Sequence, residues 1–390
     1  MASNNNKDKC NVPHLRFPEF TGEWKKSTIG SLSTKVGSGV TPRGGETVYK
    51  SEGHSFVRSQ NVGWGHLQLD DIAFIDKETH LRQKNTELQL DDVLLNITGA
   101  SIGRSALVNK QIAGGNVNQH VCIIRTKDNL VPAFLCNFLL SNHGQKQIDS
   151  FQAGGNRQGL NFEQIRSIKI TIPSTKEQTK IATLLHLIDE RIATQNKIIE
   201  DLKKLKSAIS LKMLHSDSWE QFKIQDIASI GRGRVISSVE ISQQENPLYP
   251  VYSSQTSNDG IMGYLDDFMF EGEYISWTTD GANAGTVFYR NGKFNCTNVC
   301  GLLKLKKGFD AHFVSLVLAE ATRMYVSTNL ANPKLMNNTM GNIQIRLPKL
   351  EEQKRISIVF RKLHGLLETH NSLIIKYSKQ KQYLLSQMFI

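Results

Sequence analysis

The sequence is poor in the residues that build disulfide frameworks and zinc sites. Its 390 residues include five cysteines, Cys10, Cys122, Cys136, Cys296 and Cys300. The number is odd, and no second Cys or His pair at finger-like spacing accompanies the close pair Cys296 and Cys300. We therefore expect free thiols in a reducing cytoplasm and no metal site.

Long apolar runs are also missing. No segment of about 18 apolar residues occurs, which excludes a membrane-spanning helix and contact with a membrane. Residues 1–11 are polar, unlike a secretory signal, and we expect a disordered tail at 1–12. Only nine prolines accompany 29 glycines and 17 phenylalanines. This composition favours folded domains over disorder.

What the sequence has in excess is positive charge. Its 47 Lys and Arg exceed its 36 Asp and Glu, which gives a net charge of +11. That surplus suits a polyanion such as DNA, although a basic protein without such a partner would have the same composition. The length fits two domains rather than one.

The second half of the sequence repeats the first. The spacing between matched positions shrinks steadily along the chain, as expected for two copies of one fold when the second has shorter loops. The matches in chain order are Trp24 with Trp219, His54–Asn61 with Tyr249–Thr256, Thr98–Gly103 with Asp280–Gly285, Phe134 with Phe313, Asn156–Asn161 with Asn332–Asn337, and Pro173 with Pro348.

Each copy ends in a long segment whose apolar residues recur at steps of three and four. Such heptad spacing forms one seam along a helix that packs against another helix. We predict two helices of nearly 40 residues, each about 57 Å long, that pair as an antiparallel coiled coil. The alternative is that each stripe packs on its own domain. The seam residues are Ile181, Leu185, Ile188, Ile192, Ile199, Leu202, Ile209 and Met213 in the first helix, and Ile356, Phe360, Leu363, Leu367, Ile374, Tyr377, Leu384 and Met388 in the second.

The predicted fold class is α+β, a pseudo-two-fold internal repeat of two tandem domains separated by the two long helices. Candidate strands are Val93–Thr98, Val121–Arg125, Tyr274–Thr278 and Leu302–Leu305. The predicted parts are a tail at 1–12, a first domain at 13–172, a central helix at 173–215, a second domain at 216–347 and a C-terminal helix at 348–390.

Motifs of a catalytic chain are lacking. Asn246–Tyr249 is similar to the target-base loop of adenine methyltransferases but lacks the second proline, and no Gly-rich strand–helix turn precedes it. No nucleotide-binding loop ending in Gly-Lys-Ser/Thr occurs. The glycines of Thr98–Gly103 and Asp280–Gly285 predict tight turns rather than a phosphate cradle. His120 and His312 are interpreted as ordinary residues rather than ligands.

Several motifs in this order carry a family resemblance. They are Leu15–Pro18, Gly37–Pro42, Val57–Val62 and Ile172–Ala182 in the first copy, and Tyr249–Gln255 and Asp280–Thr286 in the second. With them the chain resembles, after residue 12, the specificity subunits of Type I restriction–modification systems, of the Gram-positive, staphylococcal-like type. The second helix entry, Leu347–Lys354, departs slightly from the pattern.

The resemblance implies a non-catalytic, DNA-reading role. Each domain would read one half of a split target in double-stranded DNA, and the helix pair would set the gap. The implied partners are two methyltransferase subunits and two restriction subunits. S-adenosylmethionine, ATP and Mg would be bound by those partners and not by this chain. Alternatives are a catalytic methyltransferase or nuclease, a coiled-coil scaffold without DNA specificity, and the specificity chain of a related split-site system.

Base reading requires side chains with paired donors and acceptors, and phosphate contacts require cationic or small polar groups. On that chemistry we predict two sets of DNA-binding residues. They are Arg43, Arg58, Gln60, Asn61, Arg104, Asn118 and Arg157 in the first domain, and Arg232, Arg234, Ser253, Gln255, Thr279, Asn283, Arg290 and Lys334 in the second.

Overall fold

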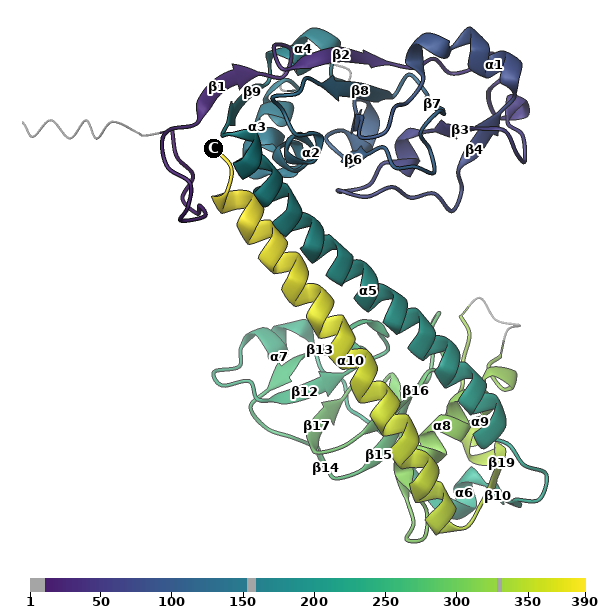
Figure 1. The fold of residues 1–390 in the computed structure, drawn as a ribbon. Helices are drawn as coiled ribbons and strands as arrows, with labels where there is room; N and C mark the ends of the chain where they lie inside the picture. The colour runs from purple at the N-terminus through teal and green to yellow at the C-terminus, as the bar shows by residue number, and fades with distance from the viewer. Residues whose placement is uncertain (1–10, 153–158, 328–331) are drawn as a thin grey trace, which may run out of the picture. The chain divides into compact units, whose positions relative to one another are not determined.

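The computed structural model describes residues 11–152, 159–327 and 332–390. The chain forms two compact units, and both long helices are divided between them. The first unit is Met1–Asn196 with Ser372–Ile390, and the second is Lys197–Asn371. Each unit therefore contains one globular domain and about half of each long helix (Figure 1).

The first domain contains three small sheets. The largest has the order β2 (Ser33–Ser38), β8 (Val121–Thr126), β5 (Val93–Asn96), β6 (Ser105–Leu107). The second has the order β4 (Ala73–Ile75), β3 (His54–Val57), β7 (Asn116–Val117), and its β3 and β7 are parallel. The third pairs β1 (Lys25–Thr28) with β9 (Lys169–Ile172). Its helices are α1 (Lys77–Arg82), α2 (Pro132–Leu140), α3 (Asn142–Ser150) and α4 (Phe162–Ser167).

The second domain repeats this plan sheet by sheet. Its first sheet has the order β11 (Ala228–Arg232), β18 (Cys300–Leu305), β15 (Tyr274–Thr278), β16 (Val287–Arg290). Its second sheet has the order β13 (Ile261–Leu265), β12 (Tyr249–Tyr252), β17 (Lys293–Cys296), β14 (Phe270–Glu271). The third pairs β10 (Glu220–Lys223) with β19 (Gln344–Leu347). Its helices are α6 (Ile224–Ile227), α7 (Ser238–Ser242), α8 (Ala311–Ala321) and α9 (Asn337–Asn342). The predicted internal repeat is a repeated fold, and the α+β class is confirmed.

Matched residues make matched contacts in the two cores. Trp24 packs edge-on against Phe134 of α2 at a ring separation of 6.0 Å. Trp219 packs edge-on against Phe313 of α8 at 5.9 Å. The glycines predicted to form tight turns all have positive φ, so they occupy a conformation that other residues rarely adopt. Those glycines are Gly99, Gly103, Gly281 and Gly285.

The two long helices are α5 (Thr175–Met213, 39 residues) and α10 (Leu350–Gln387, 38 residues). A buried glutamine anchors the start of each. Gln178 accepts a hydrogen bond from the backbone N–H of Val131, just before α2, and donates to the carbonyl of Pro173. Gln353 accepts from the N–H of Asp310, just before α8, and donates to the carbonyl of Pro348. Both helices are thereby fixed to their own domains.

Within the first unit, the start of α5 and the end of α10 run antiparallel. Asp189 of α5 pairs with Lys381 of α10 at 2.6 Å, and Arg191 lies over the ring of Tyr377. Going forward along α5 therefore means going backward along α10. Ile181, Leu185 and Ile188 share one core cluster with Leu384 and Met388 and with the domain's own core.

The second unit contains the complementary halves. Ile209 and Met213 of α5 pack against the cluster that contains Ile356 and Phe360 of α10 and Phe313 of the domain. All sixteen predicted seam side chains are buried or half-buried. In each unit the apolar stripe is covered both by the domain and by the other helix, so the two packing alternatives occur together.

A polar cluster joins the second domain to α10. Nδ1 of His312 lies 2.9 Å from the hydroxyl of Ser357, which also accepts from Nε of Arg361 at 3.3 Å. Arg361 lies over the ring of Tyr289 and pairs with Glu273 at 3.6 Å. Burial, and next the charge of Arg361, lower the pKa of His312 to about 4.

We expect this histidine to make the stability of the second unit depend on pH. The unfolded chain binds the His312 proton below about pH 6.5, whereas the folded chain binds it only below about pH 4. Stability is therefore lost as pH falls through that window. His312→Gln should reduce the loss between pH 7 and pH 5 by about 1 kcal/mol, after allowance for solvent screening. Urea unfolding at both pH values measures it.

The matched control is His364→Gln, because the His364 side chain is 58% exposed on α10, the helix whose Ser357 contacts His312. Equal pH sensitivity in wild type and His312→Gln would contradict the prediction.

Candidate nucleic-acid interface

A short loop follows β3 in the first domain and carries three of the predicted DNA-binding residues. Asn61 is fully buried, accepts from the backbone N–H of Arg58 and donates to the carbonyl of Gln68. Three polar side chains of the loop, Arg58, Gln60 and Asn61, donate to the carboxylate of Asp71. The loop is therefore ordered by its own hydrogen bonds before any ligand binds.

Two further segments of the first domain lie beside this loop. The side chain of Asn96, at the end of β5, donates to the carbonyl of Ser59 at 2.8 Å, and its backbone N–H donates to the carbonyl of Arg104 in the tight turn. The backbone N–H of Asn118 donates to the carbonyl of Val57. The fold thus brings the Arg58 loop, the glycine turn and the Asn118 segment together.

The equivalent loop of the second domain follows β12 and is closed differently. The N–H of Ser253 donates to the carbonyl of Gly260 at 2.8 Å, and the side chain of Gln255 donates to the carbonyl of Ile261. Asn258 and Asp259 both have positive φ in this loop. Such conformations in residues other than glycine cluster at functional sites.

Other predicted residues of the second domain surround this loop. Asn283 of the glycine turn donates to the carbonyl of Ser254 at 3.3 Å, and Thr297 lies 3.3 Å from the hydroxyl of Ser253. Arg234 lies at a bridge to Thr297 and pairs with Glu240. Lys334 is exposed and pairs along the backbone with Asp280 of the turn.

Arg290 was predicted to contact DNA directly, but it does not lie on the surface. It is 5% exposed, its guanidinium lies 3.6 Å from the ring centroid of Tyr252 and 4.3 Å from that of Phe288, and its Nε donates to Ser276. Burial lowers its pKa from the usual value. It lies directly beneath Gly260 of the loop. Arg290 is therefore a support for the loop.

Three other predicted residues are also buried, which corrects their expected role. Asn61 is fully buried and holds the backbone of Arg58 and Gln68. Thr279 is 2% exposed and donates to the carbonyl of Val299. Asn118 is 7% exposed and accepts from the N–H of His120. Their polar groups hold neighbouring backbone, which is what a loop support needs.

The remaining predicted residues keep exposed or half-exposed side chains. They are Arg43, Arg58, Gln60, Arg104, Arg232, Arg234, Ser253, Gln255, Asn283 and Lys334. Arg43 has no described side-chain contact with the Arg58 loop, and Arg232 donates instead to Asn337. Arg157 lies outside the described residues.

Asp71 is the residue that sequence reasoning missed. It precedes β4, and only the pairing of β3 with β4 brings it to Arg58. A carboxylate between a tight loop and a strand gives no local signal of that contact.

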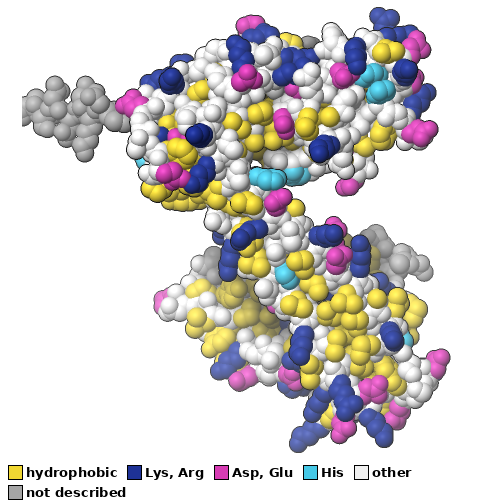
Figure 2. Space-filling model, viewed as in Figure 1, with side chains coloured by type: hydrophobic (Ala, Val, Ile, Leu, Met, Phe, Trp, Pro, Cys, Tyr) yellow, Lys and Arg dark blue, Asp and Glu magenta, His cyan; other side chains and the backbone are white. Residues whose placement is uncertain are grey.

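On the face drawn in Figure 2, Lys and Arg side chains are spread over both units, with acidic side chains among them. The net positive charge therefore forms no single basic patch on that face. The described cysteines, Cys122, Cys136, Cys296 and Cys300, are free thiols, as predicted. Within the described ranges, no group of three His, Cys, Asp or Glu side chains is arranged to hold a metal ion, and no helix could cross a bilayer.

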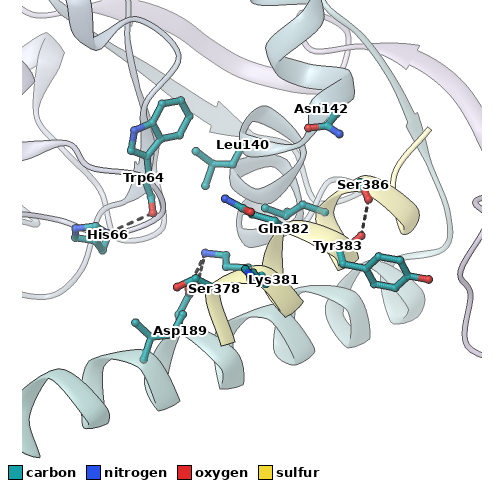
Figure 3. A pocket seen from close by; sticks show the side chains of 13 residues that line it. Trp64, His66, Leu140, Asn142, Asp189, Ser378, Lys381, Gln382, Tyr383 and Ser386 are labelled. Atoms are coloured by element: carbon teal, nitrogen blue, oxygen red, sulfur yellow. Dashed lines mark hydrogen bonds and ion pairs between the residues drawn. The ribbon is translucent and has the colours of Figure 1, made fainter. Parts of the chain in front are cut away.

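Each unit has a cleft where its domain meets the helices. In the first unit a cleft of about 920 Å³ lies between Trp64 of the domain and the end of α10, with the Asp189–Lys381 pair beside it (Figure 3). In the second unit a cleft of about 750 Å³ is lined by Lys206 and Leu211 of α5 and by Arg323. The repeat matches Lys206 with Lys381, so the two clefts are equivalent positions.

Comparison with known proteins gives a family match over most of the chain. The model of the Type I restriction modification DNA specificity domain matches residues 21–204 and 216–376. Two proteins of Mycoplasma pneumoniae named as type I specificity subunits are similar in sequence. One is 36% identical over 246 residues, covering 59% of this chain and 89% of that protein; the other is 37% identical over 230 residues, covering 57% and 95%.

Solved structures share the fold. The chain is similar to the crystal structure of a Type I restriction–modification S subunit from M. genitalium, with a TM-score of 0.68 and 17% identity over 97% of this chain and 99% of that one. A structure described as the basis of complex assembly in a type I restriction–modification system has a TM-score of 0.54 and 15% identity, over 93% and 96%.

Arg58, whose side chain is 17% exposed, gives a direct test of base reading. Arg58→Ala should weaken binding by about 1–3 kcal/mol for targets with one particular base, because a bidentate arginine contact discriminates by that amount. Arg82→Ala is the matched control, since Arg82 is a 74% exposed cation of the same domain. Competition binding on a library of DNA sequences measures both. Equal weakening on all sequences would make Arg58 a phosphate contact.

Proposed function

Because the chain belongs to the family of Type I restriction modification DNA specificity domains, we propose that it is the subunit that selects the DNA sequence on which a Type I restriction–modification complex acts. Each domain reads one half of a split target in double-stranded DNA. The proposal places the protein in the cytoplasm, where the DNA of a bacterial cell lies. Family membership favours this role over a catalytic chain or a scaffold without DNA specificity.

The observation that carries the proposal is one loop built twice with different chemistry. After β3 the loop has Arg58 and Gln60 with a carboxylate behind them, and after β12 it has Ser253 and Gln255 with backbone carbonyls behind them. A common frame with different donors is what two different half-sites require, since arginine suits guanine and amides suit adenine.

The partners proposed are two methyltransferase subunits and two restriction subunits. Two equivalent clefts, each formed by a domain and the helices, support two docking sites of one kind. Exposed large side chains border them, among them Trp64 and Tyr383 in the first and Leu211 in the second. S-adenosylmethionine, ATP and Mg are assigned to these partners, which would transfer the methyl group and cleave DNA.

The test is a map of N6-methyladenine across the genome of cells that carry the methyltransferase subunit, with and without this gene. Loss of methylation at one split motif on deletion is the expected result, and it would reveal both half-sites. An unchanged map would contradict the proposal. Reintroduction of the wild-type gene, which should restore the same motif, is the control.

The repeat also suggests that residues 1–215 can form a dimer. Lys206, Ile209 and Met213 of α5 match Lys381, Leu384 and Met388 of α10 in the repeat. A second copy of the fragment could therefore supply Lys206 to Asp189, as Lys381 does in the first unit. The dimer would read a palindrome made of the first half-site.

We expect the purified fragment to be dimeric by sedimentation and Lys206→Glu to weaken the dimer, because like charges would then meet. Lys204→Glu is the control, since Lys204 is exposed on the same helix. A strictly monomeric wild-type fragment would contradict the prediction.

A further inference from the structure

One carboxylate organises three donor side chains of the first domain's loop. Oδ2 of Asp71 accepts from Gln60 and, at 3.3 Å, from Nη2 of Arg58, whereas Oδ1 accepts from Asn61 at 2.9 Å. Arg58 also donates to the backbone carbonyl of Asp71 at 2.6 Å. Three neighbouring donor side chains therefore point at one residue.

The exposure of this carboxylate is unusual for such a hub. The Asp71 side chain is 57% exposed, whereas Asp92, which pairs with Arg125 in the same domain, is 1% exposed. A carboxylate needed only to hold a loop could be as buried as Asp92. Asp71 instead lies at the surface beside Arg58 and Gln60, where the DNA is proposed to bind.

The hydrogen-bonding capacity of Asp71 is not exhausted. An ionised carboxylate offers about four lone-pair sites. Its two oxygens accept one hydrogen bond at Oδ1 and two at Oδ2 from the described residues. A site on Oδ1 remains for an external donor. DNA phosphates offer only acceptors and repel a carboxylate, so the group that suits this site is an N–H of a base.

In the major groove the exposed amino groups belong to cytosine N4 and adenine N6. We propose that Asp71 is a specificity-determining residue that accepts a hydrogen bond from the exocyclic amino group of one such base while it holds Arg58 and Gln60 in place. The inference rests on the proposed function. In the second domain the equivalent glutamine, Gln255, donates to the backbone carbonyl of Ile261 instead.

The variant Asp71→Asn tests the inference, since it has the same shape but replaces one acceptor oxygen by an N–H donor. The protein is assayed with its methyltransferase subunits, by methylation of a DNA library in which both half-sites are randomised. The control is Asp70→Asn, which removes the same charge from the neighbouring exposed residue. Thermal unfolding of each variant is measured alongside.

The expected result is a loss of preference for cytosine or adenine at one position of the first half-site, by roughly 5- to 150-fold. The second half-site and the Asp70→Asn variant should keep wild-type preferences. A uniform change on all sequences, equal for the two variants, would overturn the inference, because it would reflect charge alone. Unchanged preferences in Asp71→Asn would also overturn it.

Loss of preference throughout the first half-site would show that Asp71 only orders the loop, and this too would overturn the inference. If the Asp71→Asn protein does not fold, Asp71→Glu is tested in its place. It keeps the carboxylate and should therefore keep the preference for the same base at that position. Failure of the wild-type complex to methylate any split site would instead contradict the proposed function. The two failures are therefore distinguishable.

Discussion

The architecture depends on the attachment of each long helix to its own domain through a buried amide. Gln178 and Gln353 each satisfy a backbone N–H at the start of a short domain helix and a carbonyl at the helix entry. An unsatisfied buried group of this kind costs about 1–3 kcal/mol, so domain and helix are held in one geometry. The apolar seam then adds the half of the other helix to the same core.

On this shared frame the two domains have diverged by exchanging apolar for polar groups. The strand pairing matches Val108, a core residue of the first domain, with Arg290 of the second. A buried arginine is costly without compensation, and here the rings of Tyr252 and Phe288 compensate. The repeat likewise matches Ala133 and Ala182 with His312 and Ser357. Such replacements leave the shared strand order unchanged, and the second domain adds only β14 to it.

The sequence predicted the repeat, the long helices and the fold class because these depend on periodic patterns and matched residues. Both helices begin within two residues of the predicted starts. It could not separate surface readers from loop supports. Asn61, Asn118, Thr279 and Arg290 have the side chains that DNA reading requires, but the same donors and acceptors also satisfy buried backbone. Only three-dimensional contacts distinguish the two uses, as Asp71 shows.

The first unit also contains a contact between segments far apart in the sequence. The N–H of Leu15 donates to the carbonyl of Gln387 at 3.0 Å, and Phe389 packs on Phe134. In the second unit the matching segments are joined by the chain itself, because Leu214 is connected through His215–Ser218 to Trp219. The end of α10 therefore meets the start of the first domain as the end of α5 meets the start of the second, once through contacts and once through the chain itself. A chain joined at the first of these points and opened at the second would keep the same contacts within each unit.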